Sequence, residues 1–484
     1  MPSSHPSVVA SAAKAAQAAA PALGAFPLTR RSALLRDLAR TLGDHDVRLA
    51  SVAEDETRLG AERLKGEIHR TRVQLEMFAD VVEDGGFLDA VIDHADPSAL
   101  PAPRPDLRRM LVPLGPVAVF SASNFPFAFS VLGGDTASAL AAGCPVVVKA
   151  HEGHPRLSDL TARLAADVLP EGVLTVIHGR EAGRELVTDP AIRAVGFTGS
   201  TAGGRALFDL AASRPDPIPF YGELGSLNPV VVTPAACVAR GAELARGFAA
   251  SATLGQGQFC TKPGLLFLPE GHGLDEVLRG EFASRAPAPL LGEWIANSYR
   301  TTLTALAAHP AVRPLHNPPQ PADPRHAAPA LLTTTAEALR TSPELLEECF
   351  GPASLVVTYT TRNDVLETLR ALPAGLTATV QGEEAEDEEL FHALTAALYT
   401  GRLVWNGWPT GVAVTAAMHH GGPWPATTSP LHTSVGTRAI TRWLRPIAYQ
   451  NTPDAFLPPP LQDANPWNVP REVNPPGVPG SRQG

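Results

Sequence analysis

A cysteine that follows a glycine-rich turn is the residue in this sequence best placed for nucleophilic chemistry. Cys260 ends the run GQGQFC, and the small apolar residues before this run favour a helix. Gly255 and Gly257 allow a tight turn that brings peptide N–H groups close to the sulfur. A thiolate formed near a helix end is a strong nucleophile, whereas on residue type alone a free cysteine is more commonly buried and structural. The surrounding motifs decide between these two interpretations.

Separated motifs in a fixed order carry a resemblance to a known family. They are SASNFPFAF at 121–129, VVVKAHE at 146–152, GFTGS at 196–200, GELGSLNP at 222–229, GQGQFCTKPG at 255–264 and ECFGP at 348–352. This set resembles the aldehyde dehydrogenases over nearly the whole chain. The closing stretch 401–450 is similar to one branch of that family. This branch contains the 2-oxoglutarate semialdehyde (2,5-dioxopentanoate) dehydrogenases and the NADP-linked long-chain aldehyde dehydrogenases.

The resemblance implies a catalytic role for three residues. Cys260 would attack an aldehyde to give a thiohemiacetal, and Asn124 and the Cys260 backbone N–H would donate hydrogen bonds to its oxyanion. Glu223 would activate the water that hydrolyses the resulting thioester. We expect the apolar neighbours Tyr221 and Leu224 to raise the pKa of the Glu223 carboxyl group by desolvation. Relatives that transfer the acyl group to coenzyme A generally lack a working base here, so Glu223 favours release of a free acid.

A nicotinamide dinucleotide is the cofactor that the resemblance implies. No GxGxxG motif follows the first expected strand, at 117–121. The turn FTGSTAGG, after the fourth expected strand at 194–197, takes its place. Glycines at such a junction present N–H groups and a helix N-terminus to a pyrophosphate. Glu348 would accept hydrogen bonds from the nicotinamide ribose, Phe350 would pack near that ring, and Lys149 would reach the adenosine ribose. The expected cofactor-binding residues are therefore Lys149, Glu152, Gly199, Ser200, Gly204, Glu348 and Phe350.

Glu152 bears on the choice between NAD and NADP. Relatives of this branch usually carry an uncharged residue at this position, three residues after Lys149. A carboxylate binds both ribose hydroxyls and repels a 2′-phosphate, so Glu152 favours NAD. Arg156, or His151 and His154, offers positive charge to a phosphate, and NADP therefore stays open as the alternative.

The substrate pocket is less well defined by the sequence. Aromatic residues are more often part of a core, but those near the oxyanion turn and in the closing stretch are candidates for the pocket lining. They are Phe125, Phe127, Phe129, Trp405, Trp408 and Trp424. A substrate carboxylate requires an arginine at the far end of the pocket, and no motif identifies it. His419 and His420 have no carboxylate or cysteine at metal-ligand spacing, so we predict no metal site.

The predicted activity is NAD(P)-dependent oxidation of an aldehyde to a carboxylic acid. By similarity to the branch, the expected substrate is 2-oxoglutarate semialdehyde, which yields 2-oxoglutarate. The first alternative keeps this chemistry with a long-chain aliphatic aldehyde. A second is a cofactor-independent thiol esterase that uses the same Cys260, Asn124 and Glu223, and a third is a member without activity. The intact cofactor-binding set argues against the esterase, and the intact nucleophile and base argue against the inactive member.

The order of the expected elements predicts an α/β protein. Strands alternate with helices from residue 111 onward, which is typical of a parallel sheet with helices on both faces and here of a Rossmann-like cofactor domain. The expected strands are 117–121, 146–149, 174–177, 194–197 and 265–268. The expected helices include 30–42, 59–78 with stop signals at Gly85 and Gly86, 127–142, 157–168, 179–187 and 238–254, within a helical region from about 7 to 100.

We predict three regions along the chain. Residues 1–223 form N-terminal helices and the dinucleotide-binding domain, 224–435 the α/β catalytic domain, and 436–484 a C-terminal return segment with a proline-rich tail. No structure is predicted for 286–330, and the acidic run 383–389 is expected to be a solvated helix start. Nine prolines from Pro453 onward exclude regular structure and leave an extended strap or a partly disordered tail. The resemblance implies a homodimer or homotetramer joined by a small oligomerisation element.

Composition excludes several classes of function. The 484 residues are 44% hydrophobic and 18% charged, which is typical of a globular protein of more than one domain. A net charge of −10 without a Lys/Arg stripe argues against nucleic-acid binding, and no apolar run reaches the length of a membrane span. The alanine-rich N-terminus lacks the basic start of a signal peptide and is expected to be helical. Four cysteines without CxxC spacing favour a reducing cytoplasm.

Overall fold

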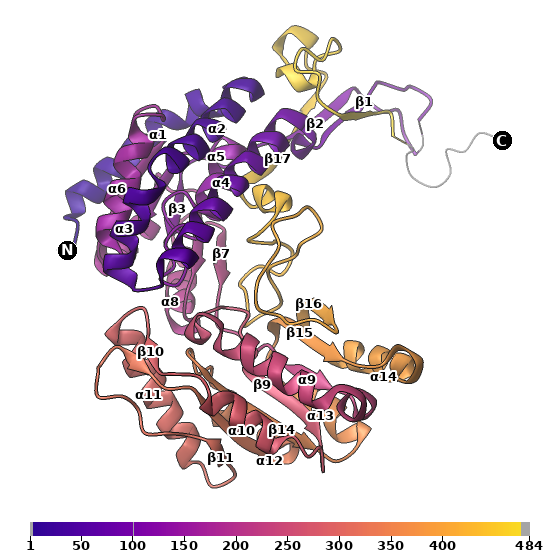
Figure 1. Cartoon of the computed structure of the whole chain (residues 1–484). Coiled ribbons are helices and arrows are strands. Elements are labelled where there is room, and N and C mark those ends of the chain that lie inside the picture. Colours follow the sequence, from indigo (N-terminus) through magenta and orange to yellow (C-terminus); the bar gives the residue numbers. More distant parts are fainter. Residues whose placement is uncertain (1–2, 100, 476–484) are drawn as a thin grey trace.

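A five-stranded parallel sheet forms the centre of one lobe of the computed structural model, which describes residues 3–99 and 101–475 (Figure 1). Its strands are β3 (Val117–Phe120), β4 (Val146–Lys149), β5 (Leu174–Ile177), β6 (Ala194–Thr198) and β7 (Phe220–Glu223). The order is β5-β4-β3-β6-β7, and every neighbouring pair is parallel. The chain therefore adds strands on one side of β3 and then, from β6, on the other. The carboxyl edge at this reversal is where such sheets bind ligands.

Helices cover both faces of this sheet. They are α1 (Pro6–Gly24), α2 (Leu28–Asp44), α3 (Asp46–Thr57), α4 (Ala61–Asp84), α5 (Gly134–Ala142), α6 (Pro155–Ala166), α7 (Arg180–Thr188) and α8 (Thr201–Ala212). Val117 and Val119 pack in one buried cluster with α2, α4, α5 and α6, whereas Ala118 and Phe120 pack in another with α1, α7 and α8. This alternation follows from the two-residue period of a strand. None of the described helices combines the length and apolar character needed to cross a bilayer.

The predicted strands of this sheet are confirmed, but the helix expected over 127–142 begins only at Gly134. The backbone N–H groups of Phe127 and Ala128 donate to Glu67 Oε1 at 2.8 and 2.9 Å, so they are not available to a helix. The chain then folds tightly back, because a Cβ at Gly133 would lie 2.5 Å from the Ala128 carbonyl oxygen. Residues 127–133 therefore form a turn that a side chain of α4 holds.

A seven-stranded sheet forms the second lobe. In the order β11-β13-β14-β9-β8-β15-β16, only the β11–β13 pair is antiparallel among the described strands. The bounds are β8 (Val230–Val232), β9 (Leu265–Pro269), β11 (Arg313–His316), β13 (Ala330–Thr335), β14 (Ala353–Tyr359), β15 (Gly375–Gln381) and β16 (Thr400–Trp405). Its helices are α9 (Pro234–Thr253), α10 (Asp275–Ala283), α11 (Glu293–Ala308), α12 (Ala336–Thr341), α13 (Arg362–Ala371) and α14 (Glu384–Ala397).

Two stretches of this lobe extend or correct the sequence analysis. Residues 286–330 contain α11, β11 and a two-stranded sheet of β10 (Ala288–Pro289) and β12 (His326–Ala327). The acidic run does begin a helix, α14, but it is not entirely solvated. Asp387 is buried because its Oδ2 accepts hydrogen bonds from Thr233 Oγ1 at 2.5 Å and from the Glu383 backbone N–H at 2.8 Å.

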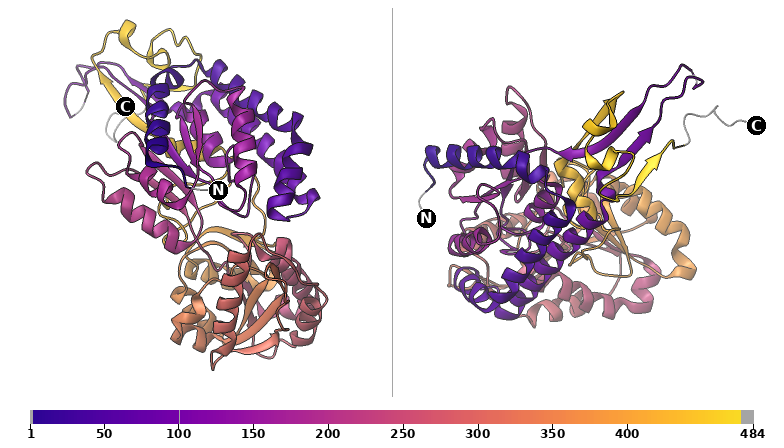
Figure 2. Two further views of the ribbon diagram at one scale, coloured as in Figure 1. Left: turned by 90° about the vertical axis from the view of Figure 1, so that its left-hand side faces the viewer. Right: turned by 90° about the horizontal axis from the view of Figure 1, so that it is seen from above.

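A third, four-stranded sheet joins distant parts of the chain in the order β17-β2-β1-β18. Its strands are β1 (Ala90–Asp93), β2 (Leu107–Pro113), β17 (Leu444–Gln450) and β18 (Arg471–Val473). The expectation of helix up to residue 100 is wrong at β1, and the expectation of no regular structure after Pro453 is wrong at β18. The three residues of β18 include no proline, so their N–H groups can pair, and they lie parallel to Ala90–Ile92. Figure 2 shows this sheet projecting from the body of the molecule. Residues 476–484 of the tail lie outside the described residues.

Candidate active site

Cys260 lies on a turn between α9 and β9 whose shape requires glycine. Gly255, Gln256 and Gly257 have φ values of 55°, 57° and 64°, in the left-handed region. A Cβ at Gly257 would lie 2.1 Å from the Gly351 carbonyl oxygen, so no larger residue fits there. The turn leaves Cys260 half-buried.

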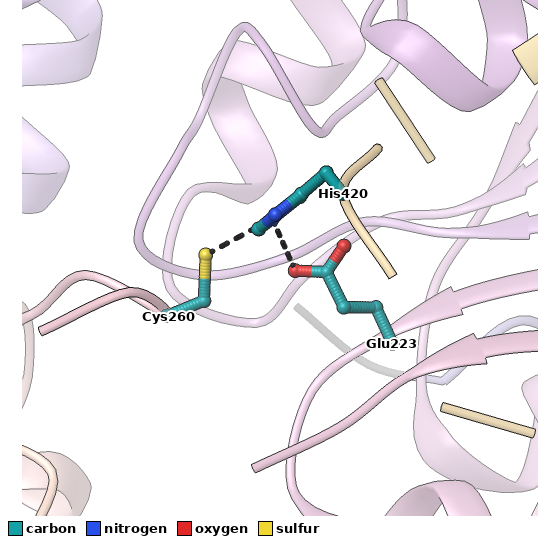
Figure 3. Close-up of side chains that lie close together, drawn as sticks. All are labelled: Glu223, Cys260 and His420. Carbon is teal, nitrogen blue, oxygen red and sulfur yellow. Dashed lines mark hydrogen bonds and ion pairs between the residues drawn. The ribbon is translucent and has the colours of Figure 1, made fainter. Parts of the chain in front are cut away.

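His420 and Glu223 flank the Cys260 sulfur. Figure 3 shows the three side chains pointing toward one another. His420 Nε2 lies 3.4 Å from Cys260 Sγ and 2.9 Å from Glu223 Oε1, and both His420 and Glu223 are buried. If His420 Nδ1 carries the ring proton, Nε2 is free to accept the thiol proton, and the imidazolium formed would then pair with the carboxylate.

The long loop between β16 and β17 places His420. The Ala426 carbonyl of this loop accepts a hydrogen bond from the Leu224 N–H at 2.8 Å, next to the end of β7. The His420 N–H donates to Thr433 Oγ1 at 2.9 Å, and Ser434 Oγ donates to Glu223 Oε2 at 2.5 Å. The loop therefore holds the backbone of His420 and the second oxygen of the carboxylate at the same time.

The pKa of the Glu223 carboxyl group shifts in the direction opposite to our expectation. Burial alone would raise it, but the charge of His420 and hydrogen bonds with His420, Ser434 and Cys260 outweigh burial and lower the pKa. Sequence reasoning considered only the apolar neighbours and missed these partners. This lowering acts while His420 carries a positive charge, the state that follows transfer of the thiol proton to Nε2, and it keeps Glu223 ionised in that state.

The pKa of the Cys260 thiol is raised well above its usual value. Burial is the largest cause, and the charge of Glu223, a hydrogen bond with Glu223 and the charge of Glu348 add to it, whereas Arg70 opposes it. The glycine turn by itself therefore does not produce a thiolate. A neighbouring base is required, and His420 Nε2 is in contact with the sulfur.

His420 is the functional candidate that the sequence analysis missed. No carboxylate or cysteine stands at metal-ligand spacing from His420 in the sequence, because its neighbours Glu223 and Cys260 are distant along the chain. In the structure the donor atoms of Glu223, Cys260 and His420 all lie within 4.8 Å of one another, a set of oxygen, sulfur and nitrogen that a divalent metal also accepts. The available signal was the position of His420 within HHGGPWPATT, in the closing stretch that carries the resemblance to the branch.

Asn124 lies against the nucleophile turn. It follows β3, its side chain is buried, and its Nδ2 donates to the Gln258 carbonyl at 2.9 Å. A carboxamide has two N–H donors, so the second can serve an oxygen bound at Cys260. The structure thus brings Asn124, Glu223 and Cys260 together from two lobes.

The start of α8 fits a pyrophosphate. Ser200 caps this helix by accepting the Gly203 N–H at its Oγ, and Gly199 and Ser200 are exposed at the carboxyl edge of the sheet. A Cβ at Gly204 would lie 2.2 Å from Leu224 Cδ2, so glycine is needed for the helix to approach the end of β7. Exposed N–H groups at a helix N-terminus are the expected binding site for a phosphate group.

Lys149 and Glu152 form an ion pair at the end of β4, with Nζ 2.7 Å from Oε1. The residues that were the alternative candidates for binding a 2′-phosphate either contact other groups of the protein or are neutral. Arg156 lies against Glu56, with Nε 3.4 Å from Oε1, and His154 is buried with Nε2 2.9 Å from the Ala122 carbonyl oxygen. Burial lowers the pKa of His151 to about 3, so it is neutral at physiological pH.

Glu348 and Phe350 lie on the second lobe, just before β14. Burial raises the pKa of the Glu348 carboxyl group to about 7, although the charge of Lys262 and the Ser226 N–H oppose this shift. A Cβ at Gly225 would lie 2.6 Å from Glu348 Oε2, so the carboxylate faces the segment that follows Glu223. Phe350 packs at the edge of the core of this lobe. Together, α8, Lys149 and Glu348 fit a dinucleotide that extends from the first sheet to the second lobe.

Comparison with known proteins establishes the family. The model of the aldehyde dehydrogenase family matches residues 1–444, more than nine-tenths of the chain. This chain belongs to the aldehyde dehydrogenase family. The alpha-ketoglutaric semialdehyde dehydrogenase 2 of Azospirillum brasilense is 48% identical over 459 residues, covering 92% of this chain and 87% of the relative. The alpha-ketoglutaric semialdehyde dehydrogenase of Acinetobacter baylyi is 42% identical and covers 95% of this chain and 90% of its own length.

A solved aldehyde dehydrogenase has the same fold. A mutant of aldehyde dehydrogenase C from Pseudomonas syringae, in complex with NAD⁺ and octanal, superposes with a TM-score of 0.80 at 18% identity, covering 93% of this chain and 90% of that one. The predicted fold class is therefore confirmed. The chain is an NAD(P)-dependent aldehyde dehydrogenase family enzyme.

In this aldehyde dehydrogenase, only part of the predicted aromatic set lies near the nucleophile. Phe125 contacts Phe129 and Phe259, with ring centroids 5.5 and 5.3 Å apart, and Phe259 precedes Cys260. Phe127 belongs instead to the main core of the first lobe. The tryptophans also lie elsewhere: Trp405 packs on Phe391, Trp408 on Phe248, and Trp424 is exposed over Arg205.

Proposed function

We propose that this enzyme oxidises 2-oxoglutarate semialdehyde to 2-oxoglutarate, with NAD as its preferred cofactor. The observation that supports the reaction is the contact of His420 Nε2 with both Cys260 Sγ and Glu223 Oε1. Support for the substrate comes from the two alpha-ketoglutaric semialdehyde dehydrogenases that are 48% and 42% identical to this chain.

The first step is attack by the Cys260 sulfur on the aldehyde carbon. Because the pKa of the thiol is raised, the thiol must give up its proton as it attacks, and His420 Nε2 accepts it. The C–S bond forms as the carbonyl π bond breaks. Asn124 Nδ2 and the Cys260 backbone N–H donate hydrogen bonds to the resulting oxyanion, each such donor contributing about 3 kcal/mol to a barrier of this kind.

The second step converts the thiohemiacetal to a thioester. A nicotinamide cofactor, when bound, would supply the hydride acceptor that this step requires. The groups that would hold it are the N-terminus of α8, the Lys149–Glu152 pair and the Glu348 carboxylate.

Hydrolysis of the thioester completes the reaction. Glu223 is ionised and takes a proton from water while Ser434 Oγ holds its other oxygen at 2.5 Å. The water oxygen bonds to the acyl carbon, the C–S bond breaks, and the leaving Cys260 thiolate takes back the proton that His420 Nε2 accepted in the first step. A base beside the thioester favours a free acid over acyl transfer to coenzyme A.

The remaining assignments concern cofactor, assembly and compartment. The family uses NAD or NADP, and the carboxylate of Glu152 beside Lys149 supports NAD for this enzyme. We propose a homodimer or homotetramer in which the projecting four-stranded sheet pairs subunits, a state that light scattering after size exclusion measures. All four cysteines are free thiols, which supports a reducing cytoplasm.

The deciding experiment follows nicotinamide reduction by the purified enzyme. 2-Oxoglutarate semialdehyde and octanal are each tested with NAD and with NADP. We expect the highest kcat/KM for the semialdehyde with NAD. A lead for octanal would keep the chemistry and refute the substrate, and a lead for NADP would refute the role of Glu152.

A further inference from the structure

Two arginines of α4 face the turn that carries Asn124. Arg63 and Arg70 are seven residues apart and therefore lie on the same side of the helix. The Arg63 guanidinium lies 5.4 Å from the centroid of Phe125 and 4.9 Å from that of Phe259. The Arg70 guanidinium lies 6.0 Å from the centroids of Phe125 and Phe129. Both cations thus border the aromatic cluster that adjoins Cys260.

Neither arginine forms an ion pair within the described residues, although the charge of Glu67 acts on the pKa of both. Arg63 Nη1 and Arg70 Nε are buried and have no hydrogen-bond partner within residues 3–99 and 101–475. Arg63 donates from Nη2 to the Asn124 carbonyl at 2.6 Å, whereas Arg70 has no hydrogen bond and no ion pair in that part of the chain. Burying a guanidinium without a partner is costly, so a site built this way favours an incoming anion.

Other buried arginines of the chain show the contrast. Arg108 pairs with Asp106 and Asp463, and Arg442 pairs with Asp135 at 2.7 Å. The chain supplies carboxylates to these two arginines, and it supplies the carbonyls of Leu23, Gly24 and Ala141 to Arg31, which is also buried. At Arg63 and Arg70 it supplies aromatic faces instead.

Glu67 is the acidic residue between the two arginines, and it has a different role. Its Oε1 accepts the backbone N–H groups of Phe127 and Ala128, and neither of its oxygens comes within ion-pair distance of a described arginine. Burial raises the pKa of its carboxyl group. Glu67 thus shapes the turn, and its charge acts on the pKa of Arg63 and Arg70 without forming an ion pair with either.

Arg70 is close enough to the catalytic atoms for its charge to act on them. It lowers the pKa of Cys260, and Glu223 and Cys260 in turn act on the pKa of Arg70. Arg402 is the other arginine whose pKa responds to Cys260, but its nitrogens donate to Thr377 Oγ1 and to the carbonyls of Pro409 and Gly411. The Arg402 guanidinium therefore already has hydrogen-bond partners within the protein.

We propose that Arg70, supported by Arg63, is a carboxylate subsite that selects short aldehydes with an acid group at the far end. The inference rests on the proposed function and names the residue that recognises the substrate. A planar guanidinium presents paired N–H donors that match a carboxylate, and the phenyl rings of Phe125, Phe129 and Phe259 exclude water from the contact. An aldehyde bound at Cys260 then directs its carboxylate toward α4, and a long aliphatic chain would bring no anion to the two arginines.

The test compares Arg70→Met and Arg63→Met with a matched control on the same helix. Arg72 donates from Nε to the Ala39 carbonyl at 3.1 Å, away from the aromatic cluster, so Arg72→Met is the control. The measured quantity is the ratio of kcat/KM for 2-oxoglutarate semialdehyde to kcat/KM for pentanal. Because Arg70→Met removes the charge-assisted contact with the substrate carboxylate, we expect it to lower this ratio about tenfold or more. Arg70→Lys should restore part of it, and Arg72→Met should leave it unchanged.

A binding measurement keeps the subsite testable without turnover. Glutarate added to the enzyme without cofactor should raise the Tm of the wild type and of Arg72→Met, but not that of Arg70→Met. If the wild type oxidises the semialdehyde and Arg70→Met keeps the wild-type ratio, the subsite is refuted and the proposed function stands. If the wild type does not oxidise the semialdehyde, the proposed function fails, and the glutarate shift alone then decides whether Arg70 binds carboxylates.

Discussion

His420 Nε2 lies 3.4 Å from Cys260 Sγ, although the two residues are 160 positions apart in the chain. The contact changes the explanation of how the nucleophile becomes reactive. A helix end or local positive charge would lower the thiol pKa, whereas burial and neighbouring carboxylates raise the pKa of Cys260. The candidate base in contact with the sulfur is His420, which lies in a loop that pairs with the end of β7.

Replacing His420 by asparagine removes this base. We expect kcat/KM for the aldehyde to fall about a hundredfold or more, which is typical for the loss of a general base. Alkylation of Cys260 by iodoacetamide at neutral pH should slow as well, since the thiol loses its proton acceptor. His419→Asn is the matched control, because His419 has no described contact with the sulfur. Equal alkylation rates in wild type and His420→Asn would exclude His420 as the base.

Replacing Cys260 by alanine removes the atom that bonds to the substrate. We expect no reduction of nicotinamide above background in a protein whose Tm stays close to that of the wild type, because Cys260 is only half-buried. Cys237→Ala serves as the control for loss of a thiol, since Cys237 lies at the start of α9 and packs in a buried cluster that does not include the turn. Retained turnover in Cys260→Ala would contradict the assignment of the nucleophile.

Replacing Glu223 by glutamine should separate the two halves of the reaction. Hydride transfer can still occur once, so stopped-flow absorbance should show a burst approaching one reduced cofactor per active site. Steady turnover should then be slow, because glutamine cannot take a proton from water. The burst itself should also be slower, since the charged partner of His420 is lost. Steady turnover at the wild-type rate would show that another group hydrolyses the thioester.

Replacing Glu152 by serine should shift the cofactor preference toward NADP. The change removes a negative charge that repels a 2′-phosphate and frees Lys149 Nζ, now 2.7 Å from the Glu152 carboxylate, to pair with that phosphate. A charge-assisted pair of this kind contributes about 1.5–3 kcal/mol, so the ratio of kcat/KM for NADP over NAD should rise about tenfold or more. Glu171→Ser, at an exposed position, is the control. An unchanged ratio in Glu152→Ser would place the selectivity elsewhere.

Local sequence predicted much of the fold, because its signals are local. The strands β3 to β6 are short apolar runs packed between helices, and α4 ends where Gly85 adopts a left-handed φ of 74°. The resemblance placed Cys260, Glu223 and Asn124, and the structure brings all three to one point. Their roles stay predictions until the variants are measured, as do the domain boundaries at 223 and 435.

The missed features depend on contacts between distant segments. His420 carries no spacing signal, because its partners come from β7 and from the Cys260 turn. The turn over 127–133 exists because Glu67 takes its N–H groups, and β18 forms because β1 offers it an edge. The pKa of Glu223 was placed in the wrong direction for the same reason, since its partners His420 and Ser434 lie far along the chain, in the loop before β17.

The pKa of Glu348 links folding, cofactor binding and pH. Because burial raises its pKa to about 7 in the folded enzyme, from an ordinary value near 4.5, the folded state binds a proton that the unfolded state has lost. The stability that this proton contributes is fully present below about pH 4.5 and is lost as the pH rises through about 7. Relative to Glu348→Gln, the wild type without cofactor should therefore lose up to about 2 kcal/mol of unfolding free energy between about pH 5.5 and 8.5.

Cofactor affinity should have the opposite pH dependence, because only the ionised Glu348 accepts hydrogen bonds from both ribose hydroxyls. We expect the KM for NAD of the wild type to rise as the pH falls below about 7, and that of Glu348→Gln to be higher and nearly independent of pH. Glu347→Gln is the matched control, since the adjacent Glu347 is exposed and should behave as the wild type. A pH-dependent KM for NAD that persists in Glu348→Gln would assign the titration to another group. If Glu348→Gln loses both the pH dependence of KM and the pH dependence of unfolding free energy, both effects belong to the Glu348 carboxyl group.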